Sequence, residues 1–216
     1  MSQLDLAVIL AAGEGTRMKS SRAKVLHEIA GRSLIAHVLH AVSSLNPRET
    51  RVVVGASKDE VIAHLKEISP KALTVHQEIR GGTGHAVKIA LSDYSHDGVV
   101  LVCAGDTPLL TGSTLSQLLS SHLSSGATAT VMTAEMPDPS GYGRVLRNSD
   151  GSLSAIVEEK DATEEEKQTL EINSGVYIFD IKELKSALTK ISTANAQKEE
   201  YLTDVIAVLR GEGKKV

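Results

Sequence analysis

The sequence is poor in aromatic residues and almost free of cysteine. Its 216 residues include four Tyr, one Phe, no Trp and one Cys. Proteins that bind single-stranded nucleic acid stack the bases on aromatic side chains, and this chain offers few of them. The aromatic anchors that carry the binding energy of many protein interfaces are scarce for the same reason. A single cysteine cannot form an intrachain disulfide, which agrees with a reducing, cytoplasmic location.

The chain also lacks a strong net charge and a long apolar run. Its formal net charge is −4, so no positive field favours nucleic acid or an anionic membrane. No apolar segment approaches the roughly 20 residues that span a bilayer. The apolar residues 6–10 have no basic flank and continue into a glycine loop, which predicts a first strand and not a signal peptide. We therefore expect a cytoplasmic protein with small-molecule partners, and neither nucleic acid nor membrane among them.

Three residues that could supply nucleophilic or acid–base chemistry are interpreted as structural. Cys103 lies in the apolar run of residues 99–103. Free cysteine is among the most often buried residue types, so a packing role is favoured over a nucleophile. For His27 and His85 we favour packing or a hydrogen bond within a loop.

Apolar segments alternate with amphipathic ones in the first part of the chain. Strands are predicted at residues 6–10, 51–54, 73–76 and 99–102, and helices at 33–45, 59–68, 83–91 and 113–123, the last with Ser113 as its N-cap. Apolar strands that alternate with helices predict a mostly parallel sheet covered by helices on both faces. The expected fold class is α/β.

The pattern changes after Ala127. Residues 127–134, 143–147, 153–158 and 175–180 are predicted strands with few helices between them, and residues 181–191 and 202–209 are predicted helices. We expect residues 127–180 to include a smaller antiparallel extension of the sheet. No linker rich in Pro or Gly divides the chain, so residues 1–216 are treated as one domain.

A glycine loop follows the first strand, with the sequence Leu-Ala-Ala-Gly-Glu-Gly-Thr-Arg-Met at residues 10–18. Gly13 and Gly15 remove side chains where a backbone must turn and approach a ligand, and such a turn can present an anion-binding nest of N–H groups. Arg17 and Lys24 add cations suited to phosphate oxygens. The spacing fits neither the Walker loop nor the dinucleotide fingerprint. Two glycines alone could be a plain tight turn, but the buried strand and the cations favour phosphate binding.

Two further segments are expected at the same crevice. Residues 80–84, Arg-Gly-Gly-Thr-Gly, open a helix, and the amide of Gln77 just before them suits the edge of a nucleobase. Asp106 closes the fourth strand, where a carboxylate is well placed to hold a hard cation. In an open parallel sheet the carboxyl ends of the strands face one crevice, so these groups should meet the glycine loop there. Taken alone, each segment is explained equally well as a cap or a turn.

In this order the segments resemble the sugar nucleotidyltransferases. Residues 10–18 and the following Lys-Val-Leu-His at 24–27 resemble the family signature. More narrowly they look like the N-acetylglucosamine-1-phosphate uridylyltransferase domain of bacterial bifunctional enzymes. The segments that agree in order are Gly-Thr-Gly-His-Ala at 82–86, Gly-Asp-Thr-Pro-Leu at 105–109, Gly-Tyr-Gly-Arg at 141–144, Ile-Val-Glu-Glu-Lys-Asp-Ala at 156–162, Glu-Ile-Asn-Ser-Gly at 171–175 and Tyr-Leu-Thr-Asp at 201–204. The resemblance covers nearly the whole chain.

The resemblance implies a Rossmann-like nucleotidyltransferase fold and a reaction of UTP with a sugar 1-phosphate, N-acetylglucosamine 1-phosphate in particular. Mg²⁺ is the implied cofactor, with Asp106 as its ligand, while Arg17 and Lys24 would act on the phosphates as catalytic cations. The residues implied to hold the uridine are Leu10, Ala11, Ala12, Gly13, Gln77, Gly82 and Thr83. The residues implied to hold the sugar are Gly143, Glu158 and Asn173, all within the extension 127–180.

The sequence departs from the family pattern at several positions. Ala23 stands where the family usually has Pro, Arg80 where it often has Gln, and Ala104 where Tyr is frequent. The family's second metal ligand is an Asn beyond the segment 201–204, and no Asn follows that segment here. An acetyltransferase half made of hexapeptide repeats is not seen either. We expect either a C-terminally truncated piece of a bifunctional protein or an incomplete metal site, with the oligomeric state left open.

Two alternatives remain beside the uridylyltransferase. The same fold could use another NTP or another sugar phosphate, or it could bind a nucleotide sugar without turnover. In the enzyme hypothesis a phosphate oxygen of the sugar attacks the α-phosphorus of UTP in line with the leaving pyrophosphate. Such a step depends on positioning and on charge neutralisation more than on a protein nucleophile.

Overall fold

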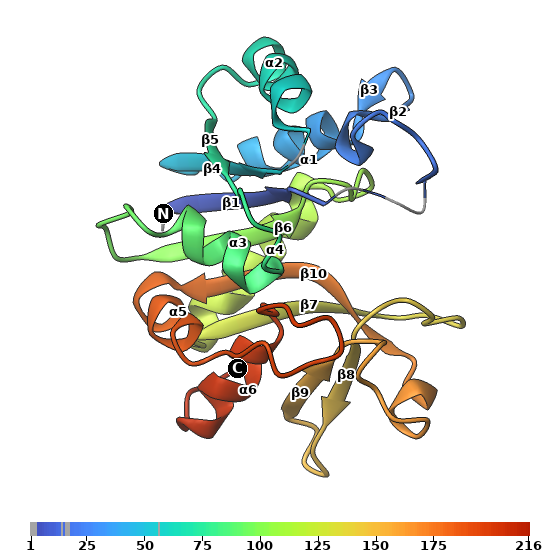
Figure 1. Cartoon of the computed structure of the whole chain (residues 1–216). Coiled ribbons are helices and arrows are strands. Elements are labelled where there is room, and N and C mark those ends of the chain that lie inside the picture. Colours follow the sequence, from blue (N-terminus) through green and yellow to red (C-terminus); the bar gives the residue numbers. More distant parts are fainter. Residues whose placement is uncertain (1–3, 14, 16–17, 56) are drawn as a thin grey trace.

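The computed structural model describes residues 4–13, 15, 18–55 and 57–216 (Figure 1). The strands are β1 (Leu6–Ala11), β2 (Glu28–Ile29), β3 (Arg32–Ser33), β4 (Glu49–Val54), β5 (Leu73–His76), β6 (Val99–Ala104), β7 (Ala129–Glu135), β8 (Arg144–Arg147), β9 (Leu153–Val157) and β10 (Glu171–Asp180). Eight of them form one sheet with the order β5-β4-β1-β6-β10-β8-β9, and β7 pairs with β10. The short strands β2 and β3 form a separate hairpin.

The helices are α1 (Leu34–Ser43), α2 (Lys58–Ile68), α3 (Thr83–Ala90), α4 (Gly112–Ser125), α5 (Ile181–Leu188) and α6 (Asp204–Gly211), with short 3-10 turns η2 (Lys24–Leu26) and η3 (Glu166–Gln168). At the start of three of the helices, α1, α4 and α5, a side chain accepts a free backbone N–H. The predicted N-cap Ser113 is wrong. The hydroxyl of Thr111, two residues earlier, accepts the N–H of Thr114 instead, so α4 begins before Ser113.

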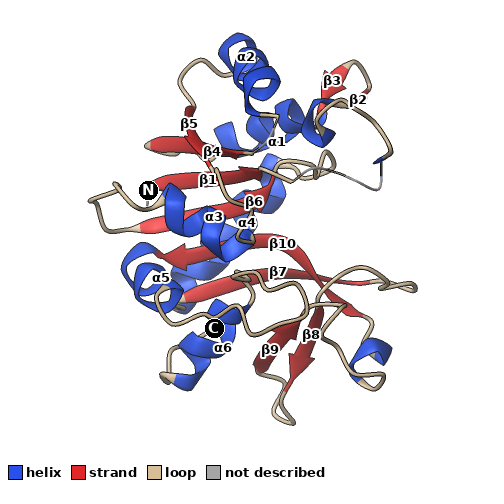
Figure 2. Ribbon diagram, in the orientation of Figure 1, coloured by secondary structure: helices blue, strands red, loops and turns tan. Residues whose placement is uncertain are grey.

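The first half of the sheet is parallel, and its strands β1, β4 and β6 are largely buried on both faces, while the edge strand β5 is partly exposed. β1 runs parallel to β4 and β6, and β4 parallel to β5. Side chains alternate between the two faces along each strand. Val8 packs on the face covered by α3, α5 and α6, while its neighbour Ile9 packs on the face covered by α1, α2 and α4. Figure 2 shows helices on both sides of the sheet. The predicted α/β fold with a two-sided helical cover is therefore confirmed.

The second half of the sheet is antiparallel, as expected for the extension. β10 runs antiparallel to β6 on one side and to β7 on the other, and its first residues reach β8. The pairing of β10 with β7 shifts between Asn173 and Val176. Gly175 has φ +77°, which glycine adopts without strain, so it permits this bulge.

The sequence pattern placed the start of β10 too late. The prediction began this strand at Gly175, although Asn-Ser-Gly at residues 173–175 has a composition typical of a turn. In the structure those residues form the bulge inside a longer strand that begins at Glu171. None of the helices in the described ranges combines the length and the hydropathy that a membrane span requires.

Candidate functional site

A cavity of about 470 Å³ opens at the carboxyl ends of β1, β5 and β6, where the parallel topology predicted a crevice. Its volume lies within the range typical of small-molecule sites, roughly 300–1,000 Å³. The predicted site residues that line it are Leu10, Ala11, Ala12, Gly13, Lys24, Gln77, Gly82, Thr83 and Asp106. Arg17 lies outside the residues that the structure describes.

The wall formed by the glycine loop depends on two close backbone approaches. Gly15 has φ +62°, and a Cβ there would lie 2.6 Å from the Cβ of Lys24, so Lys24 can pack only against a glycine. At the end of β4, a Cβ on Gly55 would lie 2.5 Å from the carbonyl oxygen of Ala12. Sequence reasoning missed Gly55, although a glycine that directly follows a buried strand was a visible signal.

Lys24 and Asp106 meet at the edge of this cavity. The Nζ of Lys24 forms an ion pair with Oδ2 of Asp106. Lys24 opens η2 and Asp106 follows β6, so the fold brings together two charges from distant parts of the sequence. Both side chains are partly exposed, and such pairs contribute about 0–1 kcal/mol to stability. The pair therefore adds little to stability, and its role in binding phosphate and metal stays a prediction.

Asp106, the residue predicted to hold a divalent cation, lines this cavity. Within the described ranges, no group of three or more His, Cys, Asp or Glu side chains is arranged to hold a metal. Mg²⁺ does not need one, because it commonly keeps several waters and binds through one or two carboxylates together with substrate phosphates. A single carboxylate beside a loop that is predicted to bind phosphate is compatible with that mode.

The opposite wall carries Gln77 and the N-terminus of α3. The Nε2 of Gln77 donates to the carbonyl oxygen of Gly82 at 3.1 Å and lies 3.0 Å from Nδ1 of His85. Because a carbonyl can only accept, the amide nitrogen must face Gly82, and these two contacts leave the amide oxygen unused. Gly82 has φ +99°, and a Cβ on Gly81 would lie 2.5 Å from the His85 ring. Both glycines are therefore required by geometry.

Residues 199–203, which we call the bridging segment, lie along this wall. Glu200 donates its N–H to the carbonyl of Gly81 at 2.7 Å, and the N–H of Leu202 donates to Oγ1 of Thr83 at 3.0 Å. Thr83 is thus held by a segment from the far end of the sequence. The bridging segment comes after β10 in the sequence, and its hydrogen bonds hold the glycine-containing residues 80–84 in place.

The far end of the bridging segment contacts the predicted sugar residues. Thr203, which is buried, donates its hydroxyl to Oε1 of Glu158 at 3.1 Å. A Cβ on Gly143 would lie 3.5 Å from both carboxylate oxygens of Glu158, and the carbonyl of Gly143 accepts the N–H of Asn173 at 2.9 Å. The structure therefore brings Gly143, Glu158 and Asn173 together. Thr203 was inside a matching segment of the sequence, but nothing there pointed to this hydrogen bond.

The environment of Glu158 favours its neutral form. Burial raises the pKa of its carboxyl above the usual range, and the hydrogen bond from Thr203 partly offsets that rise. A buried carboxyl with few partners can accept hydrogen bonds from ligand hydroxyls, which would restore some of its lost solvation. Glu158 is the acidic group that we predicted for the sugar side.

The side chain of Asn173 is partly engaged within the protein. Its Nδ2 donates to the hydroxyl of Tyr177, and its Oδ1 accepts the N–H of Gly175 at 3.0 Å. Both contacts stabilise the bulge in β10. One N–H and one lone pair of the amide are not used by these two contacts, so a role in sugar binding stays a prediction.

Cys103 is fully buried, which confirms its predicted packing role. Burial raises the pKa of its thiol to about 12, because the thiolate would lose its hydration. Near neutral pH the thiol stays protonated and enclosed by the core. Cys103 is therefore excluded as a nucleophile.

Comparison with known proteins gives many relatives of similar sequence. Over 214 residues the chain is 50% identical to a protein named bifunctional protein GlmU from Thermobifida fusca. Over 212 residues it is 52% identical to the protein of that name from Streptomyces coelicolor. Each match covers 97% of this chain and 44% of the relative, so the chain spans less than half the length of these relatives.

Solved structures agree in fold at much lower identity. A UDP-glucose pyrophosphorylase in complex with UDP-glucose superposes with a TM-score of 0.80 at 19% identity, over 99% of this chain and 89% of that chain. HddC from Yersinia pseudotuberculosis superposes with a TM-score of 0.70 at 22% identity, over 93% of this chain and 84% of that chain. At such identities the likeness establishes the fold alone, and it agrees with the predicted nucleotidyltransferase architecture.

A family match covers the part of the chain that carries the cavity. The family described as the MobA-like NTP transferase domain matches residues 7–168. This range contains the glycine loop, the second glycine cluster, Lys24 and Asp106, together with Gly143 and Glu158. The chain therefore belongs to the family of MobA-like NTP transferase domains.

Proposed function

We propose that this chain transfers the uridylyl group of UTP to N-acetylglucosamine 1-phosphate, giving UDP-N-acetylglucosamine and pyrophosphate. The observation that carries the proposal is the meeting of Lys24 and Asp106 at a cavity walled by two glycine-containing loops. Membership of an NTP transferase family supports a nucleoside triphosphate as one substrate. The choice of the amino sugar rests on the group Gly143–Glu158–Asn173 and on the identity of about 50% to the GlmU proteins.

The reaction is an in-line displacement at phosphorus. A phosphate oxygen of the sugar 1-phosphate forms a bond to the α-phosphorus of UTP. The bond from that phosphorus to the oxygen bridging the α- and β-phosphates breaks, and its electron pair leaves with pyrophosphate. The attacking phosphate is already ionised near neutral pH, so no protein base needs to take a proton. This agrees with a site that contains charges and backbone donors and no exposed cysteine.

The protein's contribution is to bring two anions together. Lys24 lies where its ammonium can neutralise phosphate charge, and the glycine loop lets the backbone at Gly13 approach the phosphates. Arg17, assigned from sequence, would add a bidentate contact to the α-phosphate. Asp106 would hold Mg²⁺, which when bound lowers the repulsion between the two substrates by neutralising phosphate oxygens.

The two subsites recognise different ends of the product. On the nucleotide side the unused amide oxygen of Gln77 can accept the N3–H of uracil, which is a hydrogen-bond donor. On the sugar side Glu158 and Asn173 can bond the hydroxyl and N-acetyl groups. The proposal places the protein in the cytoplasm, because both substrates are intracellular metabolites.

The test is pyrophosphate release from UTP and N-acetylglucosamine 1-phosphate by this chain, with Mg²⁺ and with excess chelator. Asp106→Asn is the paired variant, since it removes the charge with little change in volume. We expect release that requires Mg²⁺ and falls strongly in the variant. CTP, GTP and glucose 1-phosphate in parallel reactions identify a different substrate pair. Binding of UDP-N-acetylglucosamine without release would support a binding module, and neither binding nor release would overturn the assignment.

A further inference from the structure

The side chain of Arg144 is 2% exposed, although arginine is almost never buried without a partner. Its Nη2 contacts Oε2 of Glu159 at 2.7 Å, its Nη1 donates to the carbonyl of Tyr142, and its Nε donates to the carbonyl of Lys167 at 3.4 Å. One guanidinium therefore joins the loop before β8, the turn after β9 and the 3-10 turn η3. Nothing in the proposed reaction uses it.

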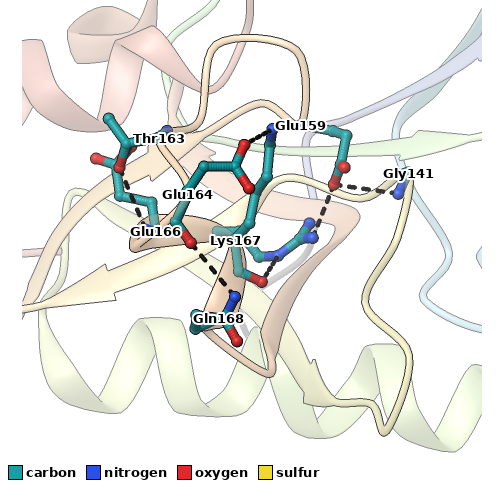
Figure 3. Close-up of polar contacts among 8 residues, drawn as sticks. Gly141, Glu159, Thr163, Glu164, Glu166, Lys167 and Gln168 are labelled. Carbon is teal, nitrogen blue, oxygen red and sulfur yellow. Dashed lines mark hydrogen bonds and ion pairs between the residues drawn. The ribbon is translucent and has the colours of Figure 1, made fainter.

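Glu159 completes the cluster from the other side. Its Oε2 also accepts the N–H of Gly141 at 3.3 Å (Figure 3). Arg144 and Glu159 thus both bond the loop before β8, at Tyr142 and Gly141 respectively. Arg144, through its hydrogen bond and its charge, holds the pKa of Glu159 below the usual range, and this carboxylate stays ionised at neutral pH. The Arg144–Glu159 contact is therefore a charged pair under working conditions.

Lys167, the third partner, belongs to a turn that is itself well ordered by local contacts. The carboxylate of Glu166 accepts both the N–H and the hydroxyl of Thr163, at 2.8 and 3.0 Å, and Lys167 pairs with Glu164 at 2.8 Å (Figure 3). The guanidinium of Arg144 ties this turn to β8. Arg144 therefore contacts three segments, each of which is held by further hydrogen bonds or ion pairs.

The cluster lies directly behind the predicted sugar subsite. In the antiparallel pair β8–β9, Arg144 is opposite Val157, so Gly143 continues the register opposite Glu158. Successive side chains of a strand point to opposite faces. Gly143 and the Glu158 carboxylate approach each other, and their immediate chain neighbours, the buried Arg144 and the partly exposed Glu159, form the ion pair.

We propose that Arg144 and Glu159 are positioning residues that set the spacing between the Gly143 backbone and the Glu158 carboxylate, and thereby the affinity for the acceptor sugar phosphate. The inference rests on the proposed function. The pair touches neither the glycine loop nor Gln77 in any contact described above, so its effect should be confined to the sugar side. Arg144 is buried but the Glu159 side chain is 34% exposed, so water screens the pair and it adds little net stability, while the planar guanidinium still fixes the distances to its three partners.

The decisive variant is Glu159→Gln, which keeps the size and one acceptor and removes the charge. Steady-state pyrophosphate release is measured with each substrate varied in turn, and thermal denaturation is measured beside it. We expect kcat/KM for the sugar phosphate to fall by about 10- to 100-fold, since a misplacement near 1 Å has effects of that order. KM for UTP should stay within about twofold. Arg144→Lys, which keeps the charge and loses the fork, should show the same selective loss.

The chain offers a matched control on the same strand. Arg147 makes a bidentate pair with Glu171, at 2.7 and 2.6 Å, between β8 and β10, and its side chain is half-exposed. Arg147→Gln removes a pair of equal or better geometry whose residues do not adjoin Gly143 or Glu158. We expect normal kinetics for both substrates. A loss of sugar-phosphate affinity in this variant equal to that in Glu159→Gln would overturn the inference.

Each other outcome also decides the matter. If Glu159→Gln lowers the melting temperature while both KM values stay normal, the pair is structural and the inference is wrong. It is also wrong if both KM values rise together. If the parent chain binds substrates without turnover, calorimetric titration with UDP-N-acetylglucosamine and with UTP replaces the kinetics, and the selective loss is still required. A parent chain that uses a different sugar phosphate overturns the proposed substrate, and the selective loss in Glu159→Gln is then required with that acceptor, its absence overturning the inference.

Discussion

Gly55 gives the sharpest test of how the nucleotide subsite is built. It follows β4 and lies against the carbonyl of Ala12, at the base of the glycine loop. A Cβ at this position would lie 2.5 Å from the Ala12 oxygen and 3.1 Å from the Ala12 Cα and carbonyl carbon. All three are backbone atoms, so no side-chain rotation can relieve the contact. Gly55→Ala must therefore move the loop or the end of β4.

The size of the effect follows from these distances. Ordinary van der Waals contact begins near 3.4 Å, so the carbonyl of Ala12 must retreat by about 0.9 Å. A misplacement of about 1 Å in a substrate-positioning element can cost about 100-fold in rate. We expect kcat/KM for UTP to fall by about 30- to 100-fold. Inserting one carbon into a packed site costs about 1–3 kcal/mol. At about 2–4 °C per kcal/mol for a chain of this size, the melting temperature should fall by about 2–12 °C.

The assay is pyrophosphate release with UTP varied at saturating sugar phosphate, followed by the reverse arrangement. Gly211→Ala is the matched control, because a Cβ there meets no atom within 4 Å and the residue lies at the end of α6. That variant should be active and as stable as the parent or slightly more so. A Gly55→Ala protein with parental KM for UTP and an unchanged melting temperature would refute the argument that this glycine seats the loop.

Three further predictions concern charged groups of the site. Arg17→Ala should lower kcat/KM by about 100- to 1,000-fold with circular dichroism unchanged, because it removes a cation expected to act on the developing phosphate charge; near-parental kinetics would exclude Arg17 from the mechanism. Asp106→Asn should raise the Mg²⁺ concentration needed for half-maximal rate at least about tenfold, and an unchanged Mg²⁺ titration would argue against a metal ligand. Burial raises the folded pKa of Glu158, so its ionisation costs stability above that pKa, and the cost fades as pH falls towards the unfolded value near 4.3. Glu158→Gln should therefore raise the free energy of unfolding in urea at pH 7, with the difference gone below about pH 4; a variant that is less stable at pH 7 would contradict this.

Much of the parallel half was predictable because its signals are local. Mostly apolar runs of four or five residues marked the buried strands β1, β4 and β6, and the alternation of Val8 and Ile9 between two cores follows from strand geometry. The crevice followed from topology, since parallel strands present their carboxyl ends together. That rule was enough to predict that the two glycine segments would open on one crevice, and the cavity there is lined by Gln77 and Asp106 and also by Lys24.

The antiparallel half was harder to predict, because its geometry depends on pairing between distant segments. Asn-Ser-Gly at residues 173–175 has the composition of a turn, and only its two flanking ladders make it a bulge. The hydrogen bond from Thr203 to Glu158 and the burial of Arg144 join segments that no periodicity relates. A sequence pattern shows which residues are polar, and the tertiary fold decides which of them meet.

The strand β10 has a consequence for building chimeras between members of this family. Its last five residues form the ladder with the parallel strand β6, and its first three reach β7 and β8 in the extension. The antiparallel extension is therefore joined to the parallel half by the hydrogen bonds between β10 and β6. A donor segment exchanged between residues 127 and 170 would leave that ladder intact, while a crossover placed inside β10 would divide the bulge from its partners. Glu158 lies inside the exchanged segment and Thr203 outside it. The donor must therefore supply a residue at position 158 that can still accept the hydrogen bond from Thr203.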